Sequence, residues 1–230
     1  MKNYIIGIGG TGAKCLEHLL HCCSAGLGPQ NLWAGMVDQD EANGNVSKTK
    51  ILLNKYTNLR ISLRNESNHD LASKSNLFKT HITSNTDAVW LPMKDANPTL
   101  EDLIKYNLLK PEVKGLMDCL YDPEELKLNL SEGFRARPNI GAAAILSTTA
   151  NEDDIFWSQI YKAIDAARGG EEVRVFIISS IFGGTGASGF PNIARRIRQI
   201  QKDKNVSSNF HLGGALMLPY FNYEVPDENM

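Results

Sequence analysis

The chain has 230 residues, of which 42% are apolar, and a formal net charge of −2. That length and apolar content can bury a sizeable core and predict one domain with an insertion. The near balance of charges excludes a general attraction to nucleic acid or to an anionic membrane, and we expect neither as a partner. No apolar run reaches the roughly 20 residues that cross a bilayer, and no signal-peptide pattern precedes the first strand. The four cysteines form no disulfide framework, so we expect a cytoplasmic protein.

The first 38 residues read as strand, turn, helix and strand. A short apolar strand over residues 2–8 runs into the glycine turn Gly9-Gly10-Thr11-Gly12. Apolar residues then recur at helical spacing, which predicts a helix from about residue 13 to residue 25. A second apolar strand is expected over residues 32–37, and it ends at Asp38.

Gly7, Gly9 and Gly12 fit the Gly-x-Gly-x-x-Gly fingerprint of dinucleotide-binding folds. In that fingerprint, glycine lets backbone amides at a helix N-terminus approach a pyrophosphate. Asp38 and Asp40 follow the second strand, at the edge of the sheet where such folds bind ligands. Their carboxylates are candidates for holding Mg²⁺ through water or for binding a ribose.

Residues 46–132 carry the weakest signals, and we interpret them as an enlarged insertion. Residues 54–81 are rich in Asn, Ser and Lys with little periodicity, which predicts surface loops with one short helix. Three further short helices are expected, over residues 100–109, 112–120 and 123–130. The insertion is interpreted as elaboration of a helical layer, with a partner-specific or filament-specific surface as the alternative.

The last third of the chain again alternates helices and strands. A helix is predicted over residues 151–168 and a buried parallel strand, covered on both faces, over residues 173–178. A glycine loop, a helix over residues 190–201 and a strand over residues 212–219 follow. This β-α-β succession calls for right-handed crossovers and a parallel sheet. The predicted fold is therefore a three-layer, doubly wound α/β domain with its ligand at the carboxyl ends of the strands.

The second glycine loop, residues 183–189, is a further candidate phosphate-binding site. It lacks the lysine of a Walker loop. It also lacks the last glycine of a Gly-x-Ser-x-Gly nucleophile elbow, because Phe190 follows Gly189. Two glycine turns after two different strands can bind one polyphosphate from two sides.

The loop sequence Gly-Gly-Thr-Gly-Ala-Ser-Gly before a helix resembles the signature loop of the tubulin and FtsZ superfamily, Gly-Gly-Gly-Thr-Gly-Ser-Gly. Phe182 replaces the first family glycine and Ser188 the last, so the chain resembles a divergent member. Three other parts resemble family segments in the family's order. They are the first phosphate loop at residues 9–12, the loop at residues 37–42, and residues 137–143, similar to Asn-Pro-Glu-Ile-Gly-Arg-Ala. Near the end, residues 221–224 resemble the Phe-x-Phe-Glu whose Glu binds the ribose.

This resemblance implies a Rossmann-like nucleotide-binding domain over residues 1–224 that binds GTP or GDP with Mg²⁺. It also implies head-to-tail self-association, with GTP hydrolysed at subunit junctions. The nucleotide-binding residues implied are Gly9, Gly10, Thr11, Gly12, Asp38, Asp40, Asn139, Gly183, Gly184, Thr185, Gly186, Ala187, Ser188 and Glu224. The family's guanine-reading central helix and catalytic acidic loop would follow the tail at residues 225–230, so we expect a fragment of a longer protein and nominate no catalytic residue.

Two other classes share part of this pattern. An adenylating enzyme of the E1/ThiF type also opens with Gly-x-Gly-Gly-x-Gly and has acidic and amide residues after the second strand, as at Asp38, Asp40, Asn43 and Asn45. Such an enzyme binds ATP, and its pattern does not include the glycine loop at residues 183–186. An NAD-type Rossmann module accounts for the first glycine turn only.

Overall fold

The structure is a computed structural model that describes residues 1–40, 42–64, 75–84, 88–94, 98–131, 133–148 and 150–218. Six strands form one sheet in the order β3-β2-β1-β5-β6, and β4 also pairs with β2. The strands are β1 (Lys2–Ile8), β2 (Asn31–Val37), β3 (His81–Ile82), β4 (Val89–Trp90), β5 (Val173–Ser180) and β6 (Phe210–Met217). All pairings between these strands are parallel.

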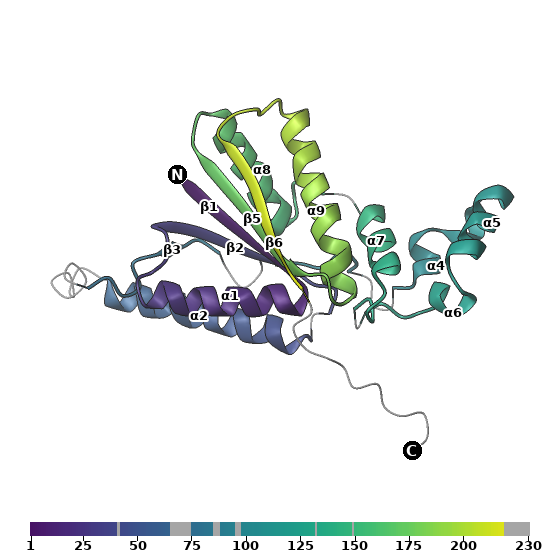
Figure 1. The fold of residues 1–230 in the computed structure, drawn as a ribbon, viewed down its shortest axis with the longest axis horizontal. Helices are drawn as coiled ribbons and strands as arrows, with labels where there is room; N and C mark the ends of the chain where they lie inside the picture. The colour runs from purple at the N-terminus through teal and green to yellow at the C-terminus, as the bar shows by residue number, and fades with distance from the viewer. Residues whose placement is uncertain are drawn as a thin grey trace, which may run out of the picture.

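Helices cover both faces of the sheet (Figure 1). On one face lie α1 (Gly9–Ser24) and α2 (Gly44–Leu63), and on the other lie α8 (Ile155–Arg168) and α9 (Gly184–Asp203). Helix α7 (Pro138–Ser147) packs against α9. Four short elements extend to one side as an arm, namely α4 (Leu100–Leu103), η2 (Tyr106–Leu108), α5 (Pro111–Leu120) and α6 (Pro123–Leu126). This arrangement confirms the predicted three-layer, doubly wound α/β domain.

The two glycine turns are shorter than predicted, because helix formation begins inside them. Helix α1 starts at Gly9 and α9 starts at Gly184, whereas the sequence predicted starts near residues 13 and 190. Gly9 and Gly183 have φ angles of 71° and 97°, a region that favours glycine, and they make the turn from strand to helix. Pro191 therefore lies inside α9 and not in its first turn.

Helix α2 corrects the prediction of surface loops from residue 54 onward. It spans 20 residues, and its buried side chains are Val46, Thr49, Leu53 and Tyr56. These four residues form one narrow seam at helical spacing, which packs on the α1 side of the sheet. Apart from the partly buried Leu52, the rest of α2 is polar or exposed, so its periodicity is weak in the sequence. The predicted interval 46–132 thus includes a helix and two strands of the main layers as well as the arm.

Strand β5 corrects a second prediction, because only one of its faces is fully covered. Val173, Val175 and Ile177 are buried in the main core with α8 and α9. The alternate residues Arg174 and Phe176 are exposed, and Phe176 keeps 40% of its surface. Among the described residues, α1 covers the centre of this face and leaves the β5–β6 side open. The helix predicted over residues 112–120 is present as α5 and begins one residue earlier. The helices predicted over residues 100–109, 123–130 and 151–168 are present but shorter, and α8 begins at Ile155 after an Asp154 N-cap.

Candidate functional site

A pocket of about 200 Å³ lies at the carboxyl ends of β1, β2 and β5. The chain leaves β1 toward β2 on one side, and β5 pairs with β1 on the other, so the strand order reverses at this point. Parallel α/β sheets bind ligands at such switch points. The lining comes from four segments. They are Ile8 at the end of β1 with residues 9–11 at the start of α1, Asp38, Asp40 and Asn43 after β2, residues 133–136 before α7, and Ser180 at the end of β5 with residues 182–186, which lead into α9.

The two glycine turns meet at this pocket. A Cβ atom at Gly9 would lie 3.3 Å from the backbone nitrogen of Gly186. The buried hydroxyl of Ser179 lies 3.2 Å from the carbonyl oxygen of Ile8 and 3.0 Å from that of Gly186, within hydrogen-bond distance of both turns. The N-termini of α1 and α9 therefore border the same cavity, where their backbone amides can bind an anion.

Asp38 is the buried carboxylate of the pocket, with 3% of its surface exposed. Its Oδ1 accepts hydrogen bonds from the backbone nitrogen of Asp40 at 3.2 Å and from the Thr185 hydroxyl at 3.3 Å. Its Oδ2 accepts one from the side-chain amide of Asn43 at 3.2 Å. Burial raises the pKa of Asp38 to about 6, although the hydrogen bonds from Asp40 and Thr185 oppose the rise.

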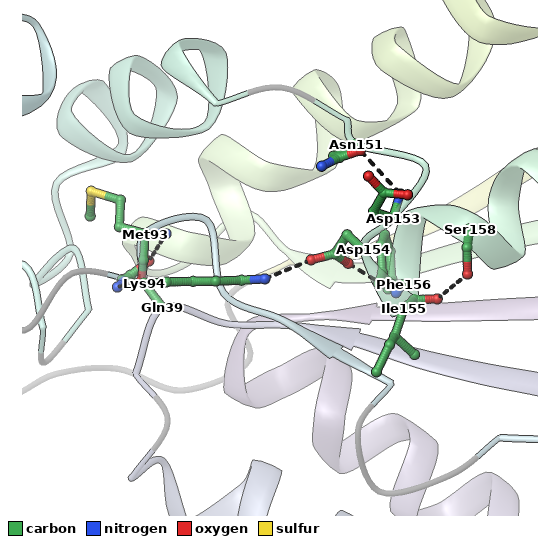
Figure 2. Close-up of polar contacts among 9 residues, drawn as sticks. All are labelled: Gln39, Met93, Lys94, Asn151, Asp153, Asp154, Ile155, Phe156 and Ser158. Atoms are coloured by element: carbon green, nitrogen blue, oxygen red, sulfur yellow. Dashed lines mark hydrogen bonds and ion pairs between the residues drawn. The ribbon is translucent and has the colours of Figure 1, made fainter.

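Gln39, between the two pocket aspartates, anchors this segment to the protein interior (Figure 2). Its side chain is 2% exposed, donates from Nε2 to the carbonyl oxygen of Met93 at 3.1 Å, and accepts at Oε1 from the Met93 backbone nitrogen at 2.9 Å. The next residue, Lys94, forms an ion pair of 2.8 Å with Asp154. Asp154 also accepts from the backbone nitrogen of Phe156 and so caps α8. These contacts fix the end of β2, and with it the aspartates, against α8.

The segment before α7 forms the third side of the pocket. Gly133 contacts the segment after β2, because a Cβ atom at this glycine would lie 3.4 Å from the Cβ atom of Asp40. Phe134 is buried and packs on the second glycine turn, where a Cβ atom at Gly184 would lie 2.6 Å from the Phe134 Cβ atom. A Cβ atom at Gly10 would lie 3.0 Å from the side-chain nitrogen of Asn43, so the first glycine turn also contacts the segment after β2. Together with the contact between the two glycine turns, these contacts connect the four lining segments into a ring around the pocket.

Most of the residues proposed from the sequence line this pocket. They are Gly9, Gly10, Thr11, Asp38, Asp40, Gly183, Gly184, Thr185 and Gly186. Gly12 lies behind the pocket, where a Cβ atom would be 2.7 Å from the carbonyl oxygen of Ile178. Ala187 does not line the pocket, and Ser188 is buried with its hydroxyl donating to the Gly184 carbonyl oxygen at 2.6 Å. Asn139 is exposed in the first turn of α7 and does not line it either, and Glu224 lies outside the described residues.

The sequence analysis did not propose several of the residues that line the pocket. They are Ile8, Asn43, residues 133–136, Ser180 and Phe182. Asn43 has a local signal, since it is the N-cap of α2 and its side chain accepts from the backbone nitrogen of Asn45 at 3.0 Å. For residues 133–136, the only sequence feature that points to the site is their position before Pro138, the first residue of α7.

A comparison with known protein families gives a match. A family model described as tubulin like matches residues 4–229. No curated protein and no solved structure gives a match. In the described segments, no helix combines the length and apolar character needed to span a membrane. Since the family match extends over nearly the whole sequence, the chain belongs to the tubulin-like family.

Proposed function

We propose that the pocket binds a guanine nucleotide, GTP or GDP. The observation that carries this proposal is the contact between the turns at Gly9 and Gly186, which directs two helix N-termini to one cavity. Glycine amides and the positive ends of two helix dipoles suit a diphosphate better than any uncharged ligand. Membership in the tubulin-like family supports guanine as the base.

The two pocket aspartates fit a Mg²⁺ ion that arrives with the nucleotide. Mg²⁺ in nucleotide sites usually has one or two carboxylates as ligands, with waters and phosphate oxygens completing its shell. Asp38 and Asp40 supply two carboxylates in the pocket. The described residues contain no group of three or more His, Cys, Asp or Glu side chains that could hold a metal alone. Asp38 and Asp40 would therefore hold the ion together with the phosphates, whose charge it would neutralise.

We further propose that the chain is part of a polymer-forming GTPase that associates head to tail in the cytoplasm. Family membership supports the self-association, and heterologous contacts of this kind generate filaments. Asp38 and Asp40 are the only carboxylates among the described pocket residues, and both are assigned to Mg²⁺. A group that aligns the attacking water would then lie outside the described residues that line the pocket, and at a subunit junction a neighbouring copy can supply it. The free thiols of all four cysteines agree with a reducing compartment.

Calorimetry with GTP, GDP, ATP and NAD⁺ in the presence of Mg²⁺ tests the proposal. We expect saturable binding of GTP and GDP and weaker or undetectable binding of the other two. Preference for ATP would instead indicate an adenylating enzyme, and preference for NAD⁺ a dinucleotide-binding module. If none of the four nucleotides binds, the proposed function is wrong.

A pair of glycine variants tests the location of the site. A Cβ atom at Gly10 would lie 3.0 Å from the side-chain nitrogen of Asn43, so Gly10→Val displaces a side chain that lines the pocket. Gly44→Val is the matched control, because nothing lies within 4 Å of a Cβ atom at the start of α2. We expect Gly10→Val to weaken GDP binding by about tenfold or more, which is the loss in affinity expected when one hydrogen bond to a charged group is removed. Equal binding by both variants would place the nucleotide elsewhere.

A further inference from the structure

Helix α5, at the far end of the arm (Figure 1), has an apolar side that is exposed to solvent. Val113, Leu116, Met117 and Leu120 recur at helical spacing and form one stripe along the helix, which we call the α5 stripe. No residue of α5 is buried, and Val113, Leu116 and Leu120 keep 40%, 54% and 54% of their surface exposed. A helix on a globular domain normally turns such a stripe toward the core. In the described part of the chain, no element covers the α5 stripe.

The polar side of α5 is the side that contacts the rest of the arm. The Tyr106 hydroxyl donates a hydrogen bond to the carboxylate of Asp118, and the Lys114 ammonium lies 4.4 Å from the centre of the Tyr106 ring. Lys114 and Asp118 are one turn apart, on the side of the helix away from the α5 stripe. A helix of 10 residues is marginal by itself in water, so it depends on contacts of this kind. These contacts fix the orientation of α5, and that orientation presents the stripe to solvent.

The spacing of the α5 stripe stays the same when the direction of the helix is reversed. Reversal about the midpoint between Leu116 and Met117 exchanges these two residues. The same reversal exchanges Val113 with Leu120. Two copies of α5 can therefore pack antiparallel about a two-fold axis, with every side chain of one stripe opposite a side chain of the other.

The charges around the α5 stripe also fit a second copy of the same helix. Residues 110–120 contain two lysines and two acidic residues, so this segment has no net charge and lacks the basic character that binds anionic lipid or nucleic acid. In the antiparallel pair, Glu112 would lie opposite Tyr121. Lys114 would lie opposite Cys119, so neither charge would face a charge of its own sign.

We infer that the α5 stripe is a contact between two copies of this chain, which pair antiparallel about a two-fold axis. Four side chains of one short helix bury less than the roughly 1,200 Å² of the smallest stable interfaces, so the contact is weak by itself. It differs from the proposed head-to-tail association, because a two-fold contact closes after two copies. In a polymer, many such contacts would act together and join two filaments side by side.

Sedimentation equilibrium of the full chain without nucleotide, from about 10 µM to about 1 mM, tests the inference. We expect a monomer–dimer equilibrium with a dissociation constant above about 1 µM. Leu116→Glu and Leu116→Lys should each weaken dimerisation at least tenfold, because residue 116 would lie beside its counterpart in the second copy, about 1.5 Å further along the axis. An equimolar mixture of the two variants should restore dimerisation, since opposite charges then meet.

Leu27→Glu is the matched control, because Leu27 follows α1 and is 79% exposed, and it should dimerise as the unmodified chain does. Leu120→Gln is a second variant for the case that the charged variants do not fold, since it shortens the stripe without a charge and should weaken dimerisation at least threefold. Circular dichroism verifies the fold of each variant.

Three results would overturn the inference. They are a chain that is monomeric at every concentration, stripe variants that dimerise as the unmodified chain does, and a mixture of oppositely charged variants that stays monomeric. In the last case the α5 stripe would contact a different surface. None of these results bears on GDP binding, which the stripe variants should leave unchanged because residues 113–120 do not line the nucleotide pocket.

Discussion

The hydroxyl of Thr185 donates a hydrogen bond of 3.3 Å to Oδ1 of Asp38, across 147 positions of the sequence. It joins the first turn of α9 to the end of β2, two elements that border the pocket from different sides. Both residues are buried, so the contact is shielded from water. The second glycine turn and the carboxylate that we assign to Mg²⁺ are thus coupled, and a change at either residue reaches the other.

Thr185→Val should weaken this coupling. Valine keeps the shape of the side chain but leaves Asp38 without one of its donors, so the pKa of Asp38 should rise further above its usual range. We expect the free energy of unfolding at neutral pH to fall by about 1 kcal/mol, measured by urea denaturation. Thr185→Ser, which keeps the hydroxyl, is the control. Equal stability of the two variants would show that the hydrogen bond contributes nothing.

Asp38→Asn should change how stability depends on pH. The pKa of Asp38 is about 6 in the folded protein and near 3.8 in an unfolded chain, so the folded state keeps the proton to a higher pH. Stability from this group is therefore fully present below about pH 4 and is lost as the pH rises through 6. The free energy of unfolding of the unmodified protein should fall relative to that of Asp38→Asn by up to roughly 3 kcal/mol across this window.

The measurement for Asp38→Asn is urea denaturation of both proteins at several values between about pH 3.5 and pH 7.5, a range that spans both pKa values. Other titrating groups cancel, because only the difference between the two proteins is compared. A difference that stays constant with pH would contradict the raised pKa.

Gly12→Ala should destabilise the fold. A Cβ atom at this position would lie 2.7 Å from the carbonyl carbon of Gly7 and 2.7 Å from the carbonyl oxygen of Ile178, and neither backbone can move freely. We expect a loss of about 1–3 kcal/mol in the free energy of unfolding, measured by chemical denaturation.

Gly115→Ala is the matched control for Gly12→Ala. Gly115 lies inside α5, where a Cβ atom would have nothing within 4 Å, so alanine adds helix propensity without a clash. This variant should be as stable as the unmodified protein or more stable, by up to about 1 kcal/mol. Destabilisation of both variants by the same amount would contradict the close packing of α1 on the sheet.

Gln39→Leu should loosen the end of β2. It removes both hydrogen bonds to Met93 and leaves two buried backbone groups without partners, at a cost of about 2–3 kcal/mol in unfolding free energy. Lys94→Ala is the control from the same segment (Figure 2), since its ion pair with Asp154 involves a lysine side chain that is 70% exposed. That control should cost less than about 1 kcal/mol. If the two variants unfold alike, the Gln39 contacts do not anchor the segment.

Local sequence patterns were enough to predict much of the fold. Two kinds of pattern depend on neighbouring residues only: the apolar runs of β1, β2 and β5, and the helical spacing within α8 and α9. From these patterns the layered α/β fold and the positions of the two glycine turns were predicted. Where only a narrow face is buried, as in α2, the local signal failed, because one seam of four residues does not produce a periodic pattern over 20 residues.

The sequence by itself determined where the chain turns tightly after β1 and β5, since glycine after a buried strand is a local requirement of close backbone contact. Tertiary structure alone decided that these turns meet, that burial raises the pKa of Asp38 to about 6, and that residues 133–136 line the same pocket. The physical reason is that burial and mutual approach depend on contacts between segments far apart in the chain, such as Phe134 with Gly184. No pattern of neighbouring residues encodes those contacts.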